Sequence, residues 1–278
     1  MSTTGQAFPP HHLRARNAAT ASENKIHDDA VARQHGFSGG LVPGITVFGY
    51  LTSPIVQAWG EPWLERGFLT ARFRQPVYDG DDVTVVTTAV SEDSDGSLTA
   101  DVEVHNPADA VCAVGQARLP AGAPQPPSLE DFPEAPLPDV RLPPTPEAMA
   151  TIDVLGSVGA GFHASRIDDT MALVGDDLPI YRELGVAHPV WLLYFANTLL
   201  AANVALGPWI HTASAVQNFD LLHDGERLSA RGRVAGLSER SGHQVVELDV
   251  LFVADGVRPV THVHHSVIYR LRTSGQNE

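Results

Sequence analysis

The chain contains two long segments without charged residues, and they constrain its fold more than any other feature. Pro43 to Trp59 and Pro189 to Leu206 are apolar nearly all round, which predicts two helices enclosed on most sides by other elements. Asn197 and Asn203 interrupt the second segment. We therefore interpret it as a buried core helix and not as a membrane span.

Alternating apolar and polar residues follow each of these segments and predict the elements that enclose the helices. A period of two is typical of antiparallel strands that are buried on one face. Because the order helix and then strands recurs, two copies of one domain explain the sequence better than one long domain. The alternating apolar positions are Leu69, Ala71, Phe73, Leu98, Ala100, Val102 and Val104 in the first half, and Leu228, Ala230, Val234, Val246, Leu248, Val250, Phe252, Val263, Val267, Tyr269 and Leu271 in the second.

Turn residues and prolines predict the connections. Asp79-Gly80 and Asp95-Gly96 are typical of hairpin turns between strands. Ten prolines between Pro120 and Pro146 indicate an extended linker that crosses a surface. The chain thus divides into residues 1–119, a linker of residues 120–149, and residues 150–278.

Charge and cysteine content exclude several classes of function. A formal charge of −15 argues against nucleic acid and against an anionic membrane surface as partners. Cys112 is the one cysteine, which excludes an intramolecular disulfide and a thiolate-rich metal site. The N-terminus lacks the apolar core of a signal peptide, so we expect a cytoplasmic protein.

A short motif before the first helix carries the strongest functional signal. Asn24 and His27 are followed by Gly39-Gly40 and then by Pro43-Gly44, where the helix is expected to begin. This stretch resembles the hydratase signature of the MaoC-like, (R)-specific enoyl-CoA hydratase family, in which a glycine and an aspartate precede Asn-Pro-Ile-His. In that register the asparagine and the histidine match. Ser22 stands at the aspartate position and Lys25 at the proline position.

The second half carries a complementary remnant of the same signature. Gly175-Asp176 keeps the glycine and the aspartate, whereas Tyr181 stands at the histidine position. Val190 replaces the glycine at the start of the second helix. A backbone amide that meets a substrate oxygen needs space in front of it, which favours Gly44. We therefore expect one functional pocket per chain, in the first half.

The resemblance implies an α+β fold, a tandem double hotdog in which each half wraps an antiparallel sheet around one apolar helix. It implies a hydratase or dehydratase acting on an acyl thioester or a polyketide-like substrate. His27 would be the general acid–base and the Gly44 amide the oxyanion donor. The implied catalytic residues are His27, Asn24 and Gly44, and the implied substrate-binding residues are Ser22, Val42, Pro43 and Ile45. No cofactor and no metal are expected, the partner is a small acyl substrate carried by CoA or a carrier protein, and a homodimer is compatible with the resemblance.

Because a serine cannot replace a carboxylate as a base near neutral pH, other readings stay open. Water activation would fall to His27 alone or to a neighbouring carboxylate such as Glu23. The fold could also serve another one-base reaction, namely isomerisation, cyclisation or thioester hydrolysis, or bind an acyl group without catalysis.

Several polar residues can be interpreted as structural as well as functional. Asn24 is equally suited to a turn or helix cap, and Asp28 and Asp29 suit a first helical turn or the orientation of His27. His188 and His211 flank the second helix and are candidates for a ligand cavity or for packing. In the cluster of His262, His264 and His265, alternation places the first two on one face of a strand, and without a spaced acid we expect no metal site there.

Overall fold

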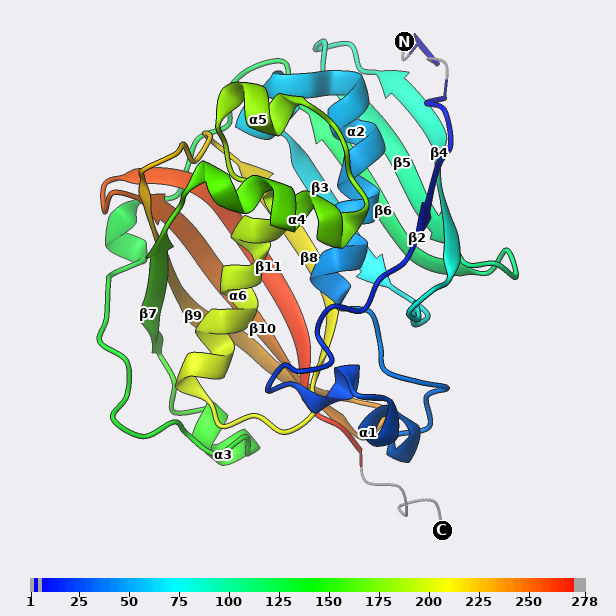
Figure 1. The fold of residues 1–278 in the computed structure, drawn as a ribbon. Helices are drawn as coiled ribbons and strands as arrows, with labels where there is room; N and C mark the ends of the chain where they lie inside the picture. Colours follow the sequence, from blue (N-terminus) through cyan, green and yellow to red (C-terminus); the bar gives the residue numbers. More distant parts are fainter. Residues whose placement is uncertain (1–2, 5–6, 273–278) are drawn as a thin grey trace.

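The computed structural model describes residues 3–4 and 7–272, and its strands form one continuous antiparallel sheet. The eleven described strands follow the order β1-β4-β5-β6-β3-β8-β11-β10-β9-β7, with β2 paired to β4. Two long helices, α2 and α6, lie on the same side of this sheet (Figure 1). This arrangement confirms the predicted α+β class.

The strand bounds agree with the predicted alternation, except that Leu271 lies just beyond the end of β11. They are β1 Thr3–Thr4, β2 His11–Arg14, β3 Phe68–Phe73, β4 Asp82–Glu92, β5 Leu98–His105, β6 Val111–Leu119, β7 Val154–Gly161, β8 Ile210–Asn218, β9 Arg227–Arg240, β10 His243–Ala254 and β11 Arg258–Arg270. The helices are η1 Lys25–His27, α1 Asp29–Gln34, α2 Gly44–Arg66, η2 Leu129–Asp131, α3 Pro146–Met149, η3 Ala164–Arg166, α4 Ile167–Val174, α5 Ile180–Leu184 and α6 Pro189–Asn203.

The strand order of the first half recurs in the second. β3, β6, β5, β4 and β2 are neighbours in that order, and β8, β11, β10, β9 and β7 repeat it. The two series meet where β3 pairs with β8, for example Leu69 with Val216. This pairing joins the halves into one sheet, so neither series ends in an open edge at that point.

The two apolar helices form the centre of the core, with some differences from prediction. Phe48, Leu51 and Ile55 of α2 are fully buried, as an all-round apolar helix requires. The helix continues past Trp59 to Arg66, with an interruption at Gly60, whose φ is +60°. α6 ends at Asn203 rather than Leu206, because Val204 is extended and forms a bridge with the linker.

One predicted hairpin is wrong. β3 and β4, which flank Asp79-Gly80, are not paired, because β6 and β5 lie between them in the sheet. The turn instead closes locally, where the Asp81 side chain accepts a hydrogen bond from the Tyr78 N–H. Asp95-Gly96 does connect the paired strands β4 and β5. Local turn chemistry predicted both turns but cannot state which strand becomes a neighbour.

The proline-rich segment packs more closely than a surface linker. Phe132 is buried and forms a small apolar cluster with Leu251 and Val253 of β10. Ala135 and Ser157 of β7 exchange hydrogen bonds. The segment therefore covers part of the sheet face opposite α6. Within the described residues, we find no helix with the length and apolarity needed to cross a membrane.

Candidate active site at the start of helix α2

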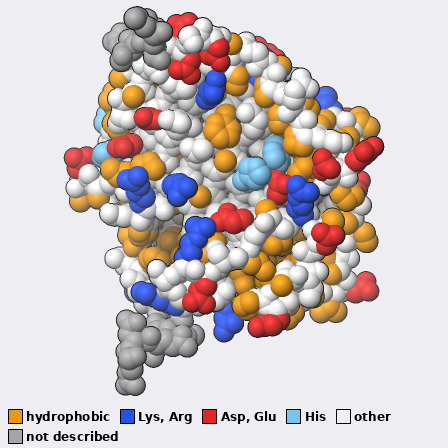
Figure 2. Space-filling model, turned by 180° about the vertical axis from the view of Figure 1, so that it is seen from behind, with side chains coloured by type: hydrophobic (Ala, Val, Ile, Leu, Met, Phe, Trp, Pro, Cys, Tyr) orange, Lys and Arg blue, Asp and Glu red, His pale blue; other side chains and the backbone are white. Residues whose placement is uncertain are grey.

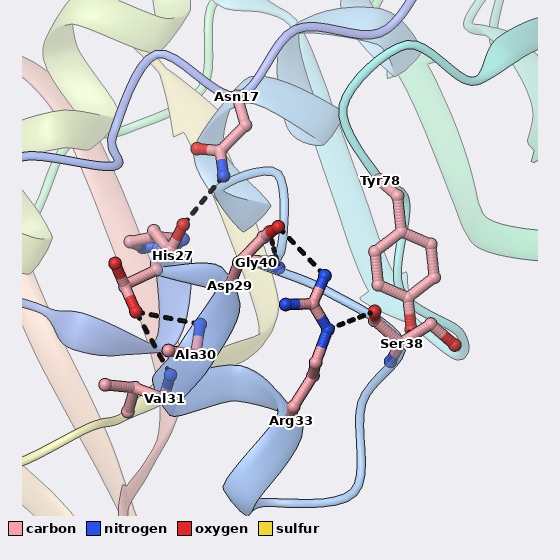
Figure 3. A network of polar contacts seen from close by, with 10 residues as sticks. Asn17, His27, Asp29, Ala30, Val31, Arg33, Ser38, Gly40 and Tyr78 are labelled. Atoms are coloured by element: carbon pink, nitrogen blue, oxygen red, sulfur yellow. Dashed lines mark hydrogen bonds and ion pairs between the residues drawn. The ribbon is translucent and has the colours of Figure 1, made fainter.

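His27 ends the short helix η1, and its backbone is held by two neighbouring segments. The Asn17 side-chain amide donates to the His27 carbonyl at 2.9 Å, as Figure 3 shows. A Cβ at position 40 would lie 2.1 Å from the same carbonyl oxygen, so only glycine fits there. The glycine of the motif thus allows the loop to close over His27.

The acidic residues after His27 organise the loop and do not bond to the imidazole. Asp28 caps α1 by accepting from the N–H groups of Ala30 and Val31. Asp29 accepts from the Gly40 N–H at 2.8 Å and pairs with Arg33, toward which it points in Figure 3. Both residues therefore stabilise the turn structure around the histidine.

The hydrogen bonds of the His27 ring define its tautomer. Its Nδ1 lies 2.7 Å from the Leu41 carbonyl oxygen, and because a carbonyl only accepts, Nδ1 carries the proton. Nε2 then carries the lone pair, which accepts a hydrogen bond from the Asn24 amide nitrogen at 3.3 Å. Burial lowers the pKa of His27, and the bond to Leu41 offsets this only in part. The neutral form is therefore favoured near pH 7.

Asn24 joins the motif to the second half of the chain. Its amide donates to the Trp209 carbonyl at 3.0 Å and accepts from the Trp209 N–H at 3.1 Å. The same oxygen caps η1 through the Ile26 N–H. With these bonds and the contact to His27, Asn24 serves as the expected cap and also fixes His27 relative to Trp209.

The start of α2 presents free backbone donors. In the part of the chain that the structure describes, the Thr46 and Val47 N–H groups bond to the Pro43 carbonyl, whereas those of Gly44 and Ile45 have no acceptor. Such N–H groups at a helix start carry partial positive charge and bind anionic oxygen atoms. Both N–H groups are therefore available to an acceptor from outside the chain.

Two cavities meet at His27. The smaller, of about 220 Å³, is lined by Gly44 and His211 among others, and the larger, of about 630 Å³, by Arg141 and Tyr194 among others. Five residues line both cavities: Asn24, His27, Pro43, Asn197 and Trp209. His27 therefore stands where the two cavities adjoin, within reach of a ligand in either.

The predicted substrate-binding residues are divided between the two cavities. Val42 lines the smaller one, Ser22 and Ile45 line the larger one, and Pro43 lines both. The Ser22 hydroxyl donates to the Asn24 carbonyl at 3.0 Å. Glu23 also lines the larger cavity, but its carboxylate pairs with Arg141 and has no bond to His27.

The remnant motif of the second half forms a closed cluster. Asp176 and His188 are both buried, with 3.4 Å between Oδ2 and Nε2. The Tyr181 ring lies against His188, and its hydroxyl is buried without a partner among the described residues. None of the three residues lines either cavity.

The histidine cluster of β11 divides between the two faces of the sheet, as alternation predicts. His265 is fully buried on the inner side. On the outer face, where Figure 2 shows histidines exposed among charged side chains, His262 and His264 approach Asp249. The ligand atoms of these three residues lie within 4.8 Å of one another, and Arg233 pairs with the same carboxylate. The acid was missed because it lies on the neighbouring strand β10.

Two residues of the site were not predicted from the sequence. Asn197 and Trp209 line both cavities, and His265 donates through Nε2 to the Asn197 amide oxygen at 2.8 Å. The available signal for Asn197 was a polar residue within an otherwise apolar helix. Trp209 had no signal, because its contact with Asn24 is made by backbone atoms.

Comparison with known proteins gives the fold its name. No protein-family model and no curated protein matches the sequence. Among solved structures, a conserved hypothetical protein of Mycobacterium tuberculosis with a double hotdog fold is 16% identical, with a TM-score of 0.62 over 96% of each chain. A MaoC-domain dehydratase from Chloroflexus aurantiacus is 13% identical, with a TM-score of 0.61 over 97% of this chain and 95% of its own.

A third structure, described as a thioesterase from Novosphingobium aromaticivorans, is 10% identical. Its TM-score is 0.58, over 95% of this chain and 98% of its own. Likenesses at these identities establish architecture and leave the reaction open. The chain has the double hotdog fold.

Proposed function

We propose that the protein adds water to, or removes water from, an acyl thioester, with His27 as general acid–base and the Gly44 N–H as oxyanion donor. One observation carries the proposal. His27, whose imidazole is neutral, and Gly44, whose N–H has no acceptor among the described residues, line the same cavity. Hydration of an enoyl thioester needs a proton carrier together with a donor for the enolate oxygen.

The proposed steps balance with His27 as the only proton carrier. In hydration, Nε2 takes a proton from water, and the water oxygen bonds to the β-carbon. The electrons of the double bond move to the thioester oxygen, where the Gly44 N–H stabilises the enolate. His27 then returns its proton to the α-carbon. Dehydration is the same sequence reversed.

The lining of the smaller cavity supports an acyl substrate. Its side chains are mainly apolar, including Ile26, Val47, Phe73 and Ile268, which suits an acyl chain. The CoA or carrier part of a thioester would then lie toward the larger cavity, which adjoins the smaller one at His27.

Thioester hydrolysis is the second candidate, and one observation favours it. Among the described residues, no Asp or Glu lines the smaller cavity. A one-base reaction needs only His27 and the oxyanion donor, with water attacking the thioester carbonyl carbon. Isomerisation and cyclisation make the same demands, whereas a non-catalytic protein would bind the acyl group without turnover.

An assay that follows two bonds separates these candidates. Purified protein is incubated with crotonyl and longer enoyl thioesters, while loss of the double bond and release of thiol are recorded together. Loss of the double bond in the wild type, abolished in His27→Gln, supports the proposal. Thiol release alone supports hydrolysis, and tight binding without either supports an acyl-binding protein.

The Ser22→Asp variant tests whether the family pattern can be restored. The serine hydroxyl donates to the Asn24 carbonyl, which a carboxylate cannot do. We therefore expect little gain in hydration, because the new carboxylate would be repelled from this carbonyl oxygen. A large gain would instead show that a carboxylate at position 22 reaches the reacting water.

A further inference from the structure

His211 of β8 reaches the smaller cavity from the second half of the chain. The residue is 5% exposed, and its ring packs edge-on against Phe73 at 4.7 Å between centroids. A Cβ placed on Gly44 would lie 2.8 Å from its Nδ1, so this nitrogen stands beside the first residue of α2. Among the described residues, this Nδ1 is buried without a hydrogen-bond partner.

The other ring nitrogen fixes the tautomer. Nε2 lies 3.2 Å from the Ala213 carbonyl oxygen and 2.8 Å from the Ser214 hydroxyl. Because the carbonyl only accepts, Nε2 carries the proton, and Nδ1 keeps an unpaired lone pair beside Gly44, which lines the smaller cavity together with His211. Burial, with a further contribution from His265, holds the pKa of His211 well below its ordinary value.

A chain of hydrogen bonds maintains this orientation. The Ser214 hydroxyl lies 2.9 Å from His265 Nδ1 and can donate to it while accepting from His211. His265 then donates through Nε2 to Asn197 at 2.8 Å. Each donor from His211 to Asn197 thus faces an acceptor, and all the hydrogen bonds point toward Asn197. The chain therefore keeps Nδ1 of His211 unprotonated.

The second half offers a comparison at the start of its own helix. His188 is equally buried, but its Nδ1 accepts from the Val190 N–H and its Nε2 faces Asp176. Both nitrogens are thus used for structure. A buried acceptor without a hydrogen bond costs stability. Of His188 and His211, His211 is the one with such an acceptor, its Nδ1.

We propose that His211 is a second catalytic residue of the same site, and that its Nδ1 holds the reacting water. This proposal rests on the proposed function. Water has two hydrogens: His27 Nε2 takes one as a proton, and His211 Nδ1 accepts the other in a hydrogen bond throughout the step. The water oxygen is thereby directed at the β-carbon. Ser214, His265 and Asn197 are positioning residues.

Two substitutions at position 211 distinguish the effect of losing the Nδ1 acceptor from the effect of losing the ring. His211→Phe keeps the ring and removes the acceptor, whereas His211→Asn can place an amide oxygen near the position of Nδ1. We expect His211→Phe to lower kcat for hydration on the order of a hundredfold, with KM within about threefold, and His211→Asn to recover at least about tenfold. His188→Asn, which alters a buried histidine outside both cavities, is the matched control and should keep kcat.

The outcomes distinguish this proposal from the proposed function. If the wild type is active and His211→Phe is equally active, the proposed role of His211 is overturned, while the proposed hydratase function is unaffected. Equal losses in the phenylalanine and asparagine variants, with matching losses of stability, indicate a structural role and also overturn it.

If the wild type hydrates nothing, the proposed function fails. Nuclear magnetic resonance of protein with ¹⁵N-labelled histidine then tests whether His211 Nδ1 is an acceptor for a ligand hydroxyl. The His211 resonances are assigned by their absence in His211→Asn. A protonated Nδ1 overturns the proposal. An unprotonated Nδ1 that shifts when a 3-hydroxyacyl amide is added supports a hydroxyl-binding acceptor, and no shift at saturation overturns it.

Discussion

The imidazole of His211 lies against the α-carbon of Gly44, although the two residues belong to different halves of the chain. A methyl group at position 44 would stand 2.8 Å from Nδ1 and 3.1 Å from both Cβ and Cγ of the histidine. The glycine at the start of α2 therefore serves two purposes. It leaves its own N–H open, and it makes room for the second imidazole.

Gly44→Ala should displace His211 and reduce turnover. The buried ring has little space to move, and a displacement of about 1 Å at a reacting group is costly. We expect kcat/KM to fall on the order of tenfold to a hundredfold. Gly122→Ala is the control, since no atom lies within 4 Å of a Cβ there. Steady-state kinetics on both variants provide the measurement, and unchanged kinetics in Gly44→Ala would contradict the packing argument.

Removal of the His27 imidazole should abolish most of the activity. His27→Gln is expected to lower kcat on the order of a hundredfold to ten-thousandfold, as for other acid–base residues. Because burial lowers the pKa of His27, the wild-type activity should persist below pH 6.5 and decline only at more acidic pH. A profile of kcat/KM against pH tests this, and a midpoint above the ordinary histidine pKa would refute it.

Acid should destabilise the protein through its buried histidines. Burial lowers the pKa of His265 to about 3, so the folded protein leaves it neutral while the unfolded chain protonates it near its ordinary pKa of 6.5. Its contribution to stability is therefore complete above about pH 6.5 and is lost as the pH falls toward 3.

For each such group, the free energy of unfolding is expected to fall by about 1.4 kcal/mol for each unit by which the pH is lowered. Urea unfolding at several pH values between neutrality and about pH 5 measures the slope. In a His265→Asn variant, the free energy of unfolding should depend on pH less steeply by one such contribution, even though the variant is less stable at every pH. An identical slope in both proteins would show that His265 is protonated in the folded state.

Tyr181→Phe should leave activity within a few fold and should not reduce stability. The hydroxyl is buried without a partner among the described residues, so its removal relieves an unpaired polar group. We expect the free energy of unfolding to stay level or rise by about 1 kcal/mol. Tyr181→Ala, which removes the fully buried ring, should instead cost about 3 kcal/mol or more. A large loss of turnover in Tyr181→Phe would point to a second working site.

Local patterns predicted much of the architecture. The apolar runs at Pro43 to Trp59 and at Pro189 to Leu206 correspond to α2 and α6 within a few residues, except that α2 continues to Arg66. The alternating segments correspond to strands, because one buried face imposes a period of two. The hairpin expected at Asp79-Gly80 was wrong, since neighbours in a sheet are chosen by long-range pairing.

The sequence by itself determined the two apolar helices and the alternating strands that follow them, and its motif marked His27, Asn24 and Gly44 as candidates. These properties depend on residues close together in the chain. The tertiary structure decided that β3 pairs with β8, that Asn24 bonds to Trp209, and that His211 lies beside Gly44. Each of these contacts joins residues from opposite halves, and only the closure of one sheet around both helices brings them together.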